Sequence, residues 1–177
     1  MIEAFFAALS TPGGRGVAVF VMLATGLALY IQGARLKTGP ETSRAVVSLE
    51  VAKTAAVASA VIRSWERERV KHIAVWQILL DFIFIAGYTA VLVAISLSAE
   101  RAAAAAGIGW LAQASHYAAY VAFVPGILDC IENIGMLIML STEPTDPTAF
   151  VTWLCACLKF GLPVLVLVPA VLAFILI

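Results

Sequence analysis

Four long apolar stretches dominate the pattern of hydrophobic and polar positions along the chain. They run from about 16 to 34, 73 to 97, 110 to 140 and 150 to 177. A hydrocarbon core of about 30 Å needs roughly 20 apolar residues at 1.5 Å of rise per residue, and each stretch meets that need. The pattern therefore predicts an all-α fold, a four-helix transmembrane bundle that forms one integral membrane domain over residues 1–177.

The segment between the first two stretches has a different period. A mostly apolar stripe recurs there at alternating spacings of four and three, at Val47, Val51, Thr54, Ala58, Val61 and Trp65. This spacing is typical of an amphipathic helix, which we place at about 41–69 on the cytoplasmic side. The helix is expected either to lie at the membrane interface with Trp65 as its anchor or to pack under the mouth of the bundle.

Charge supports the membrane assignment and orients the spans. Only 12% of the residues are charged, against about 25% in soluble domains. Eight of the eleven Lys and Arg residues fall in residues 35–72, so the positive-inside rule makes this loop cytoplasmic. We expect a multi-pass protein of the cell membrane, the bacterial inner membrane, with both termini outside the cytoplasm. A net charge of zero argues against nucleic acid as a partner.

Four ionisable residues lie inside the predicted spans: Asp81, Asp129, Glu132 and Lys159. Each costs about 2.5 to 3.5 kcal/mol on insertion scales, so such residues normally face the interior of a bundle and pair with one another. Counted from the cytoplasmic ends of the helices, all four fall about 12 to 17 Å deep. We therefore predict that they meet in one layer of the membrane.

The helical spacing adds two neighbours to this layer. Asn133 shares one helix face with Asp129 and Glu132, at i, i+3 and i+4, and Tyr88 lies two turns from Asp81 on the same face. The predicted ligand or cation site is therefore Asp81, Tyr88, Asp129, Glu132, Asn133 and Lys159. Three carboxyls and one lysine leave excess negative charge, which protons, a metal ion or water from the cytoplasm would neutralise. The candidate metal ligands are Asp81, Asp129 and Glu132, and the sequence does not identify a cofactor.

Several stretches of the chain resemble a known set of proteins. The pattern L-D-F-x-F-x-x-x-Y at 80–88, D-x-x-E-N at 129–133 and the last-span Lys159 is similar to that of uncharacterised bacterial four-helix integral membrane proteins. The match extends from about residue 49 to residue 160. The resemblance implies that these polar positions act as one unit, and it implies no substrate.

Three classes of function stay open. The chain could bind or translocate a cation, a proton or a small ligand at its carboxylate and lysine cluster. It could be a membrane-embedded enzyme acting on a lipid or isoprenoid, with Asp129 or Glu132 as general acid or base. It could instead be a structural or accessory protein whose polar cluster is only a helix-packing network. The lipid bilayer is its expected partner; a second copy, another membrane protein and a lipid ligand are open.

Overall fold

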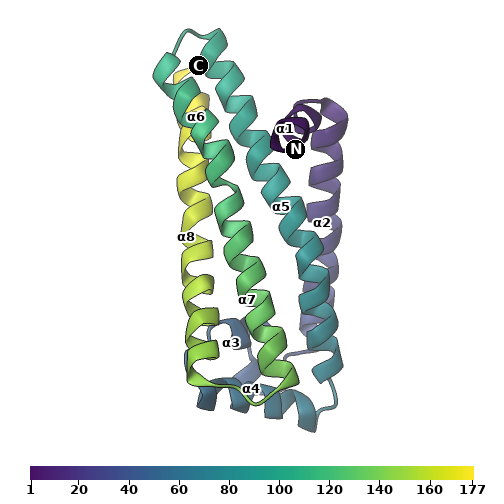
Figure 1. Cartoon of the computed structure of the whole chain (residues 1–177). Helices are drawn as coiled ribbons and strands as arrows, with labels where there is room; N and C mark the ends of the chain where they lie inside the picture. The colour runs from purple at the N-terminus through teal and green to yellow at the C-terminus, as the bar shows by residue number, and fades with distance from the viewer. The chain divides into compact units, whose positions relative to one another are not determined.

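A computed structural model describes all 177 residues and contains helices and no strand (Figure 1). The elements in chain order are α1 (Ile2–Leu9), α2 (Pro12–Ala34), the 3-10 helix η1 (Pro40–Thr42), α3 (Val47–Glu50), α4 (Ala55–Arg67), α5 (Lys71–Ala105), α6 (Gly109–Val121), α7 (Phe123–Ser141) and α8 (Asp146–Leu176).

Four helical segments are long and apolar enough to cross a membrane, which confirms the predicted number of spans. They are Pro12–Ala34, Lys71–Ala105, Gly109–Ser141 and Asp146–Leu176. The third comprises α6 and α7, which meet at Ala122, three residues before Pro125. Pro125 has no backbone N–H to donate to the carbonyl of Val121, and it lies in the first turn of α7, where proline is tolerated, so a break at this place is expected. The chain is therefore a multi-pass membrane protein by the length and composition of its helices.

The chain forms two compact units, and each unit takes a segment from all four spans. Unit 1 comprises Met1–Met22, Ile85–Ile127 and Lys159–Ile177. Unit 2 comprises Leu23–Phe84 and Leu128–Leu158. The two units are described separately below, because each has its own buried core.

Unit 1 holds the short N-terminal helix α1 against aromatic side chains of α6 and α7. Phe6 packs edge-on against Tyr120, with ring centroids 5.1 Å apart. Arg101 near the end of α5 donates hydrogen bonds to the hydroxyl and the carbonyl of Ser10, the residue that follows α1. These contacts explain how a helix of only eight residues, too short to be stable alone, is held in place.

Unit 2 contains the loop 35–70 packed onto parts of the four spans. Trp65 of α4 is completely buried, and its indole N–H donates to the carbonyl of Leu36 at 2.9 Å. The expectation that Trp65 anchors the chain at the membrane interface is therefore wrong, because an interfacial anchor would expose its ring to the headgroups. The apolar face of α4, with Ala58, Val61 and Ile62, lies in the core of this unit instead.

The region 41–69 is not one helix, which corrects the predicted bounds. It contains η1, α3 and α4, and the backbone leaves helical geometry at Ala45, whose φ is 55°. α4 begins only at Ala55, because the extended Thr54 accepts a hydrogen bond from the backbone N–H of Val57. The carboxylate of Asp146 accepts another from the N–H of Ala55 at 2.7 Å, and this long-range cap is invisible to periodicity.

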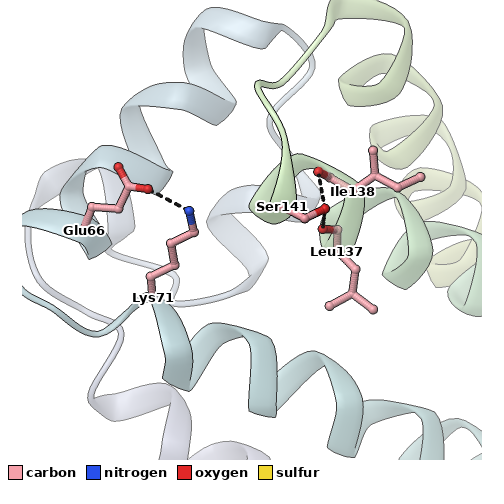
Figure 2. Close-up of polar contacts among 5 residues, drawn as sticks. All are labelled: Glu66, Lys71, Leu137, Ile138 and Ser141. Carbon is pink, nitrogen blue, oxygen red and sulfur yellow. Dashed lines mark hydrogen bonds and ion pairs between the residues drawn. The ribbon is translucent and has the colours of Figure 1, made fainter.

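Polar contacts close the ends of the helices in this part of unit 2. Figure 2 shows Lys71, the first residue of α5, paired with Glu66 of α4, with Nζ and Oε1 2.7 Å apart. The hydroxyl of Ser141 lies 2.9 Å from the carbonyl oxygen of Leu137 and 3.1 Å from that of Ile138, so it caps the last turn of α7. Both sites are exposed, so each contributes at most about 1 kcal/mol.

Candidate functional site

Two of the predicted site residues meet directly in unit 2. Asn133 of α7 donates its side-chain N–H to Oδ2 of Asp81 on α5, at 2.8 Å. Asn133 is only 1% exposed, and Asp81 is half-buried. The two bonded residues are 52 positions apart in the sequence. Their bond supports the expectation that the polar faces of α5 and α7 turn toward each other.

The helix α7 presents its polar residues inward and its apolar residues outward. Asp129 and Glu132 are buried together with Asn133. The opposite face carries Ile131, Ile134 and Ile138, all of them exposed. This arrangement is the reverse of a soluble amphipathic helix and is what a lipid-facing helix with a polar interior requires.

The other two predicted site residues belong to unit 1. Tyr88 packs against the buried core of that unit. Lys159 lies in α8, half-buried, with its Nζ 5.2 Å from the ring centroid of Phe160. No three His, Cys, Asp or Glu side chains are arranged so that they could hold a metal ion. The idea that all six residues share one site, and the metal version of that site, stay predictions.

A cavity of about 610 Å³ lies within unit 2, beside the bonded pair. Its walls come from α2, the start of the loop, α3, α5 and α7, and most of its lining is apolar, including Leu29, Ile31, Ile78 and Met136. The charged and amide residues of the wall are Lys37, Arg44, Glu50, Gln77, Asp81 and Asn133, and Tyr30 adds a hydroxyl. Neither Asp129 nor Glu132 belongs to this wall.

The two amide side chains of the wall are held in a defined orientation. Gln77 donates its Nε2 to the carbonyl of Leu29 at 3.0 Å, and Asn133 donates its Nδ2 to Asp81. A flipped amide would place an oxygen against an acceptor in both cases, so the nitrogens are assigned by their partners. The oxygens Oε1 of Gln77 and Oδ1 of Asn133 are buried and receive no hydrogen bond. Both oxygens are therefore enclosed by protein atoms.

Lys37 and Arg44 give the same cavity two positive charges. Both side chains are exposed, and neither forms an ion pair in unit 2. Glu50, by contrast, is buried and has its own interaction partner. Four of the charged and amide wall residues were not among the predicted site residues. The sequence could have indicated one of them, Gln77, as a site residue, because it lies one turn before Asp81 on the same helix face. Lys37, Arg44 and Glu50 come from an irregular loop and a four-residue helix whose path no periodicity reveals.

Unit 1 has a cavity of its own, about 570 Å³ in volume. Its lining is apolar except for Arg15 and Ser98, and these two side chains are joined by a hydrogen bond of 3.4 Å from Nη1 to Oγ. No buried polar atom without a partner belongs to its lining. The cavity of unit 2 is therefore the better candidate for specific recognition.

Comparison of the chain with models of protein families, with curated proteins and with solved structures finds no match.

Proposed function

We propose that this chain is a small polytopic membrane protein that binds an organic ligand in the cavity of unit 2, through an ammonium group or a similar donor-rich group. The observation that carries the proposal is the bonded pair Asp81 and Asn133 in the wall of a mostly apolar cavity of about 610 Å³. Ligand sites typically measure about 300 to 1,000 Å³ and combine apolar walls with a few oriented polar groups.

The charge of the wall selects the ligand class. Asp81 lines the cavity as a carboxylate and accepts a hydrogen bond from Asn133. A carboxylate is an acceptor only, and hydrogen bonds to charged groups contribute about 1.5 to 3 kcal/mol, so a ligand with positively charged N–H donors gains affinity here. A metal ion is less well supported, because no cluster of ligating side chains is assembled.

The orientation of the protein follows from the charge of its loop. Lys37 and Arg44 are part of the basic segment 35–72, which the positive-inside rule places in the cytoplasm. The cavity wall that contains them then belongs to the cytoplasmic end of the protein, and both termini lie outside. The resemblance to bacterial inner-membrane proteins supports the same compartment.

A second candidate is a structural role, and the bond between Asp81 and Asn133 favours it. Hydrogen bonds between buried side chains of neighbouring spans join membrane helices without any ligand. The enzyme alternative loses its two expected catalytic residues in this cavity, because Asp129 and Glu132 do not line it. An acid or base acting on a molecule in this cavity would come from its own wall, which contains Lys37, Glu50 and Asp81.

The test is the thermal stability of the purified protein in mild detergent with three matched compounds: 4-phenylbutylamine, 4-phenylbutanol and 4-phenylbutyrate. A ligand that binds only the folded state stabilises it by about 2.7 kcal/mol at a hundred times its Kd. We expect the amine to raise the unfolding temperature in a concentration-dependent way, the alcohol to act weakly and the carboxylate not at all. Mass spectrometry of molecules that copurify gives an independent reading.

Asp81→Asn should abolish the response to the amine. Glu66→Gln is the matched control, because it removes a carboxylate of unit 2 that does not line this cavity. Ala34→Leu, which adds volume to the cavity wall without changing charge, should also weaken the response. An equal response to amine and alcohol, or an undiminished response in both Asp81→Asn and Ala34→Leu, would overturn the proposal.

A further inference from the structure

The wall of the unit 2 cavity combines two kinds of charged group. Lys37 and Arg44 are exposed cations without an ion-pair partner, and they come from the loop after α2. The carboxylate of Asp81 comes from the interior of α5. A ligand with only a positive group would leave the two cations unmatched, so the full wall is complementary to a molecule that carries both charges.

The carboxylate of Asp81 distinguishes between kinds of positive group. A primary ammonium has N–H donors that can bond this carboxylate, which lines the cavity. A trimethylammonium group has the same charge but no N–H, so it offers the carboxylate no hydrogen bond. Because charge-assisted hydrogen bonds are the stronger ones, the wall favours the primary amine.

The cations indicate the nature of the negative group. Arg44 can bind two oxygens of one phosphate through its planar guanidinium, and Lys37 adds a point charge. Lys37 is three residues past the end of α2, a spanning helix, so it belongs near the level of the phosphates of a bilayer. Phosphate, rather than a sugar or an alcohol, is the group that membrane surroundings place at that level.

Building on the proposed function, we infer that the ligand is a primary-amine phosphate zwitterion, the chemistry of the phosphoethanolamine group. In this arrangement Asp81 accepts from the ammonium, and Lys37 with Arg44 bind the phosphate. The apolar part of the wall, including Ile31, Ile78 and Met136, covers the rest of the molecule. The group can belong to a membrane lipid or to a soluble phosphoamine.

The experiment measures binding of three lysophospholipids with the same acyl chain to the intact protein in detergent, by native mass spectrometry. Their headgroups are phosphoethanolamine, phosphocholine and phosphoglycerol. We expect the phosphoethanolamine lipid to bind roughly tenfold more tightly than either of the others, since it alone satisfies both ends of the wall. The double variant Lys37→Ala with Arg44→Ala should bind all three lipids more weakly, because each of them carries the phosphate that these cations contact. Asp81→Asn should lose the preference for the phosphoethanolamine lipid, because it removes the acceptor of the ammonium.

The matched control is Arg63→Ala with Arg67→Ala, which removes two cations of unit 2 that do not line this cavity. It should keep the affinities of the unmodified chain for all three lipids. Equal binding of the phosphoethanolamine and phosphocholine lipids, or tighter binding of the phosphoglycerol lipid, overturns the inference. If 4-phenylbutylamine still binds in that case, the proposed function stands; if it does not bind either, both fail.

A last arm decides the source of the group. Free phosphoethanolamine is added to the protein loaded with the lysolipid, at increasing concentration. Displacement at a concentration similar to that of the lipid supports the zwitterion chemistry and assigns it to a soluble molecule. Displacement that needs an excess of about a hundredfold or more supports the same chemistry in a lipid, because burial of the acyl chain then contributes to binding. An absence of displacement, joined to equal binding of the three lipids, counts against it.

Discussion

Asn133 on α7 and Asp81 on α5 are joined by a hydrogen bond of 2.8 Å. The bond links the third span to the second within unit 2, and it uses one donor of an amide whose oxygen has no partner. In membrane proteins such side-chain bonds contribute about 0.6 kcal/mol on average and about 1.7 kcal/mol at most. One bond of this size does not hold a unit together, so its place in the cavity wall is the more informative property.

This weak contribution can be measured with a double-mutant cycle of Asp81→Ala and Asn133→Ala. We expect a coupling energy of about 0.6 to 1.7 kcal/mol in denaturant unfolding without ligand, because each change removes the same bond. The pair Glu66→Ala and Asn133→Ala is the control, since these residues belong to different contacts, and its coupling should be near zero. A coupling near zero for Asp81 and Asn133 would mean that the bond does not form.

A glycine sets the distance between α7 and α8 in unit 2. A Cβ added to Gly135 would overlap the hydroxyl oxygen of Thr152, a completely buried residue. Gly135→Ala should therefore destabilise the protein by about 1 to 3 kcal/mol, as overpacking does. Thr152→Ala should restore most of this loss in the double variant, because it removes the overlapping oxygen. Measurement is by thermal unfolding in detergent.

Thr152→Val is the matched control for the rescue of Gly135→Ala by Thr152→Ala. It keeps a group of similar size where the hydroxyl was, so it should not rescue Gly135→Ala. If valine rescues as well as alanine, the overlap at the hydroxyl is not the cause of the destabilisation, and the close approach of the two helices is disproved.

The four spans could be read from the sequence because hydrophobicity is summed over a whole helix. An error of a few residues at each end does not change the number of stretches near 20 apolar residues. The loop 35–70 could not be read in the same way. Its fold depends on a cap from Asp146, ninety-one positions away from Ala55, and on a positive φ at Ala45. Neither feature leaves a periodic trace.

The sequence predicted only the part of the site that depends on the facing of two helices. Asp81 and Asn133 belong to faces that helical spacing identifies, and they do meet. Tyr88 is on the same face as Asp81, but it is two turns along α5 and packs in the core of unit 1. The spacing of residues on one helix tells which side chains share a face, but it does not tell which residues of another helix they contact. The cations Lys37 and Arg44 needed the loop to be folded before they could be assigned to any wall.

A second glycine offers a contrast, because its neighbour is backbone. A Cβ on Gly87 of α5 would lie 2.8 Å from the nitrogen and 3.0 Å from the Cα of Met22 on α2, both in unit 1. Gly87→Ala should cost about 3 kcal/mol, at the upper end for overpacking, because the helices must separate. Val21→Ala should give no rescue, although its side chain is also close. Gly16→Ala, on α2 with open space around it, should instead stabilise by up to about 1 kcal/mol. Rescue by Val21→Ala would contradict this explanation.

Two helices end in the same backbone motif with different residues at its left-handed position. After α4, the N–H of Val70 donates to the carbonyl of Trp65 and that of Arg69 to Glu66, with a φ of 56° at Arg69. After α5, Ile108 and Gly107 repeat these bonds to Ala103 and Ala104, with a φ of 75° at Gly107. Both sets are the bonds of a Schellman motif, in which glycine carries no steric penalty.

Exchange of glycine at these two positions should therefore have opposite effects on stability. Arg69→Gly should stabilise the protein by about 1 kcal/mol, because it removes the cost of a left-handed non-glycine residue. Gly107→Ala should destabilise it by about the same amount, and only through the backbone, since nothing lies within 4 Å of the added Cβ. Gly107→Asn should fall between glycine and alanine, because asparagine enters this conformation more easily. Thermal unfolding of the four proteins in one detergent gives the order, and an Asn variant no better than the Ala variant would show that the left-handed conformation is not what limits stability there.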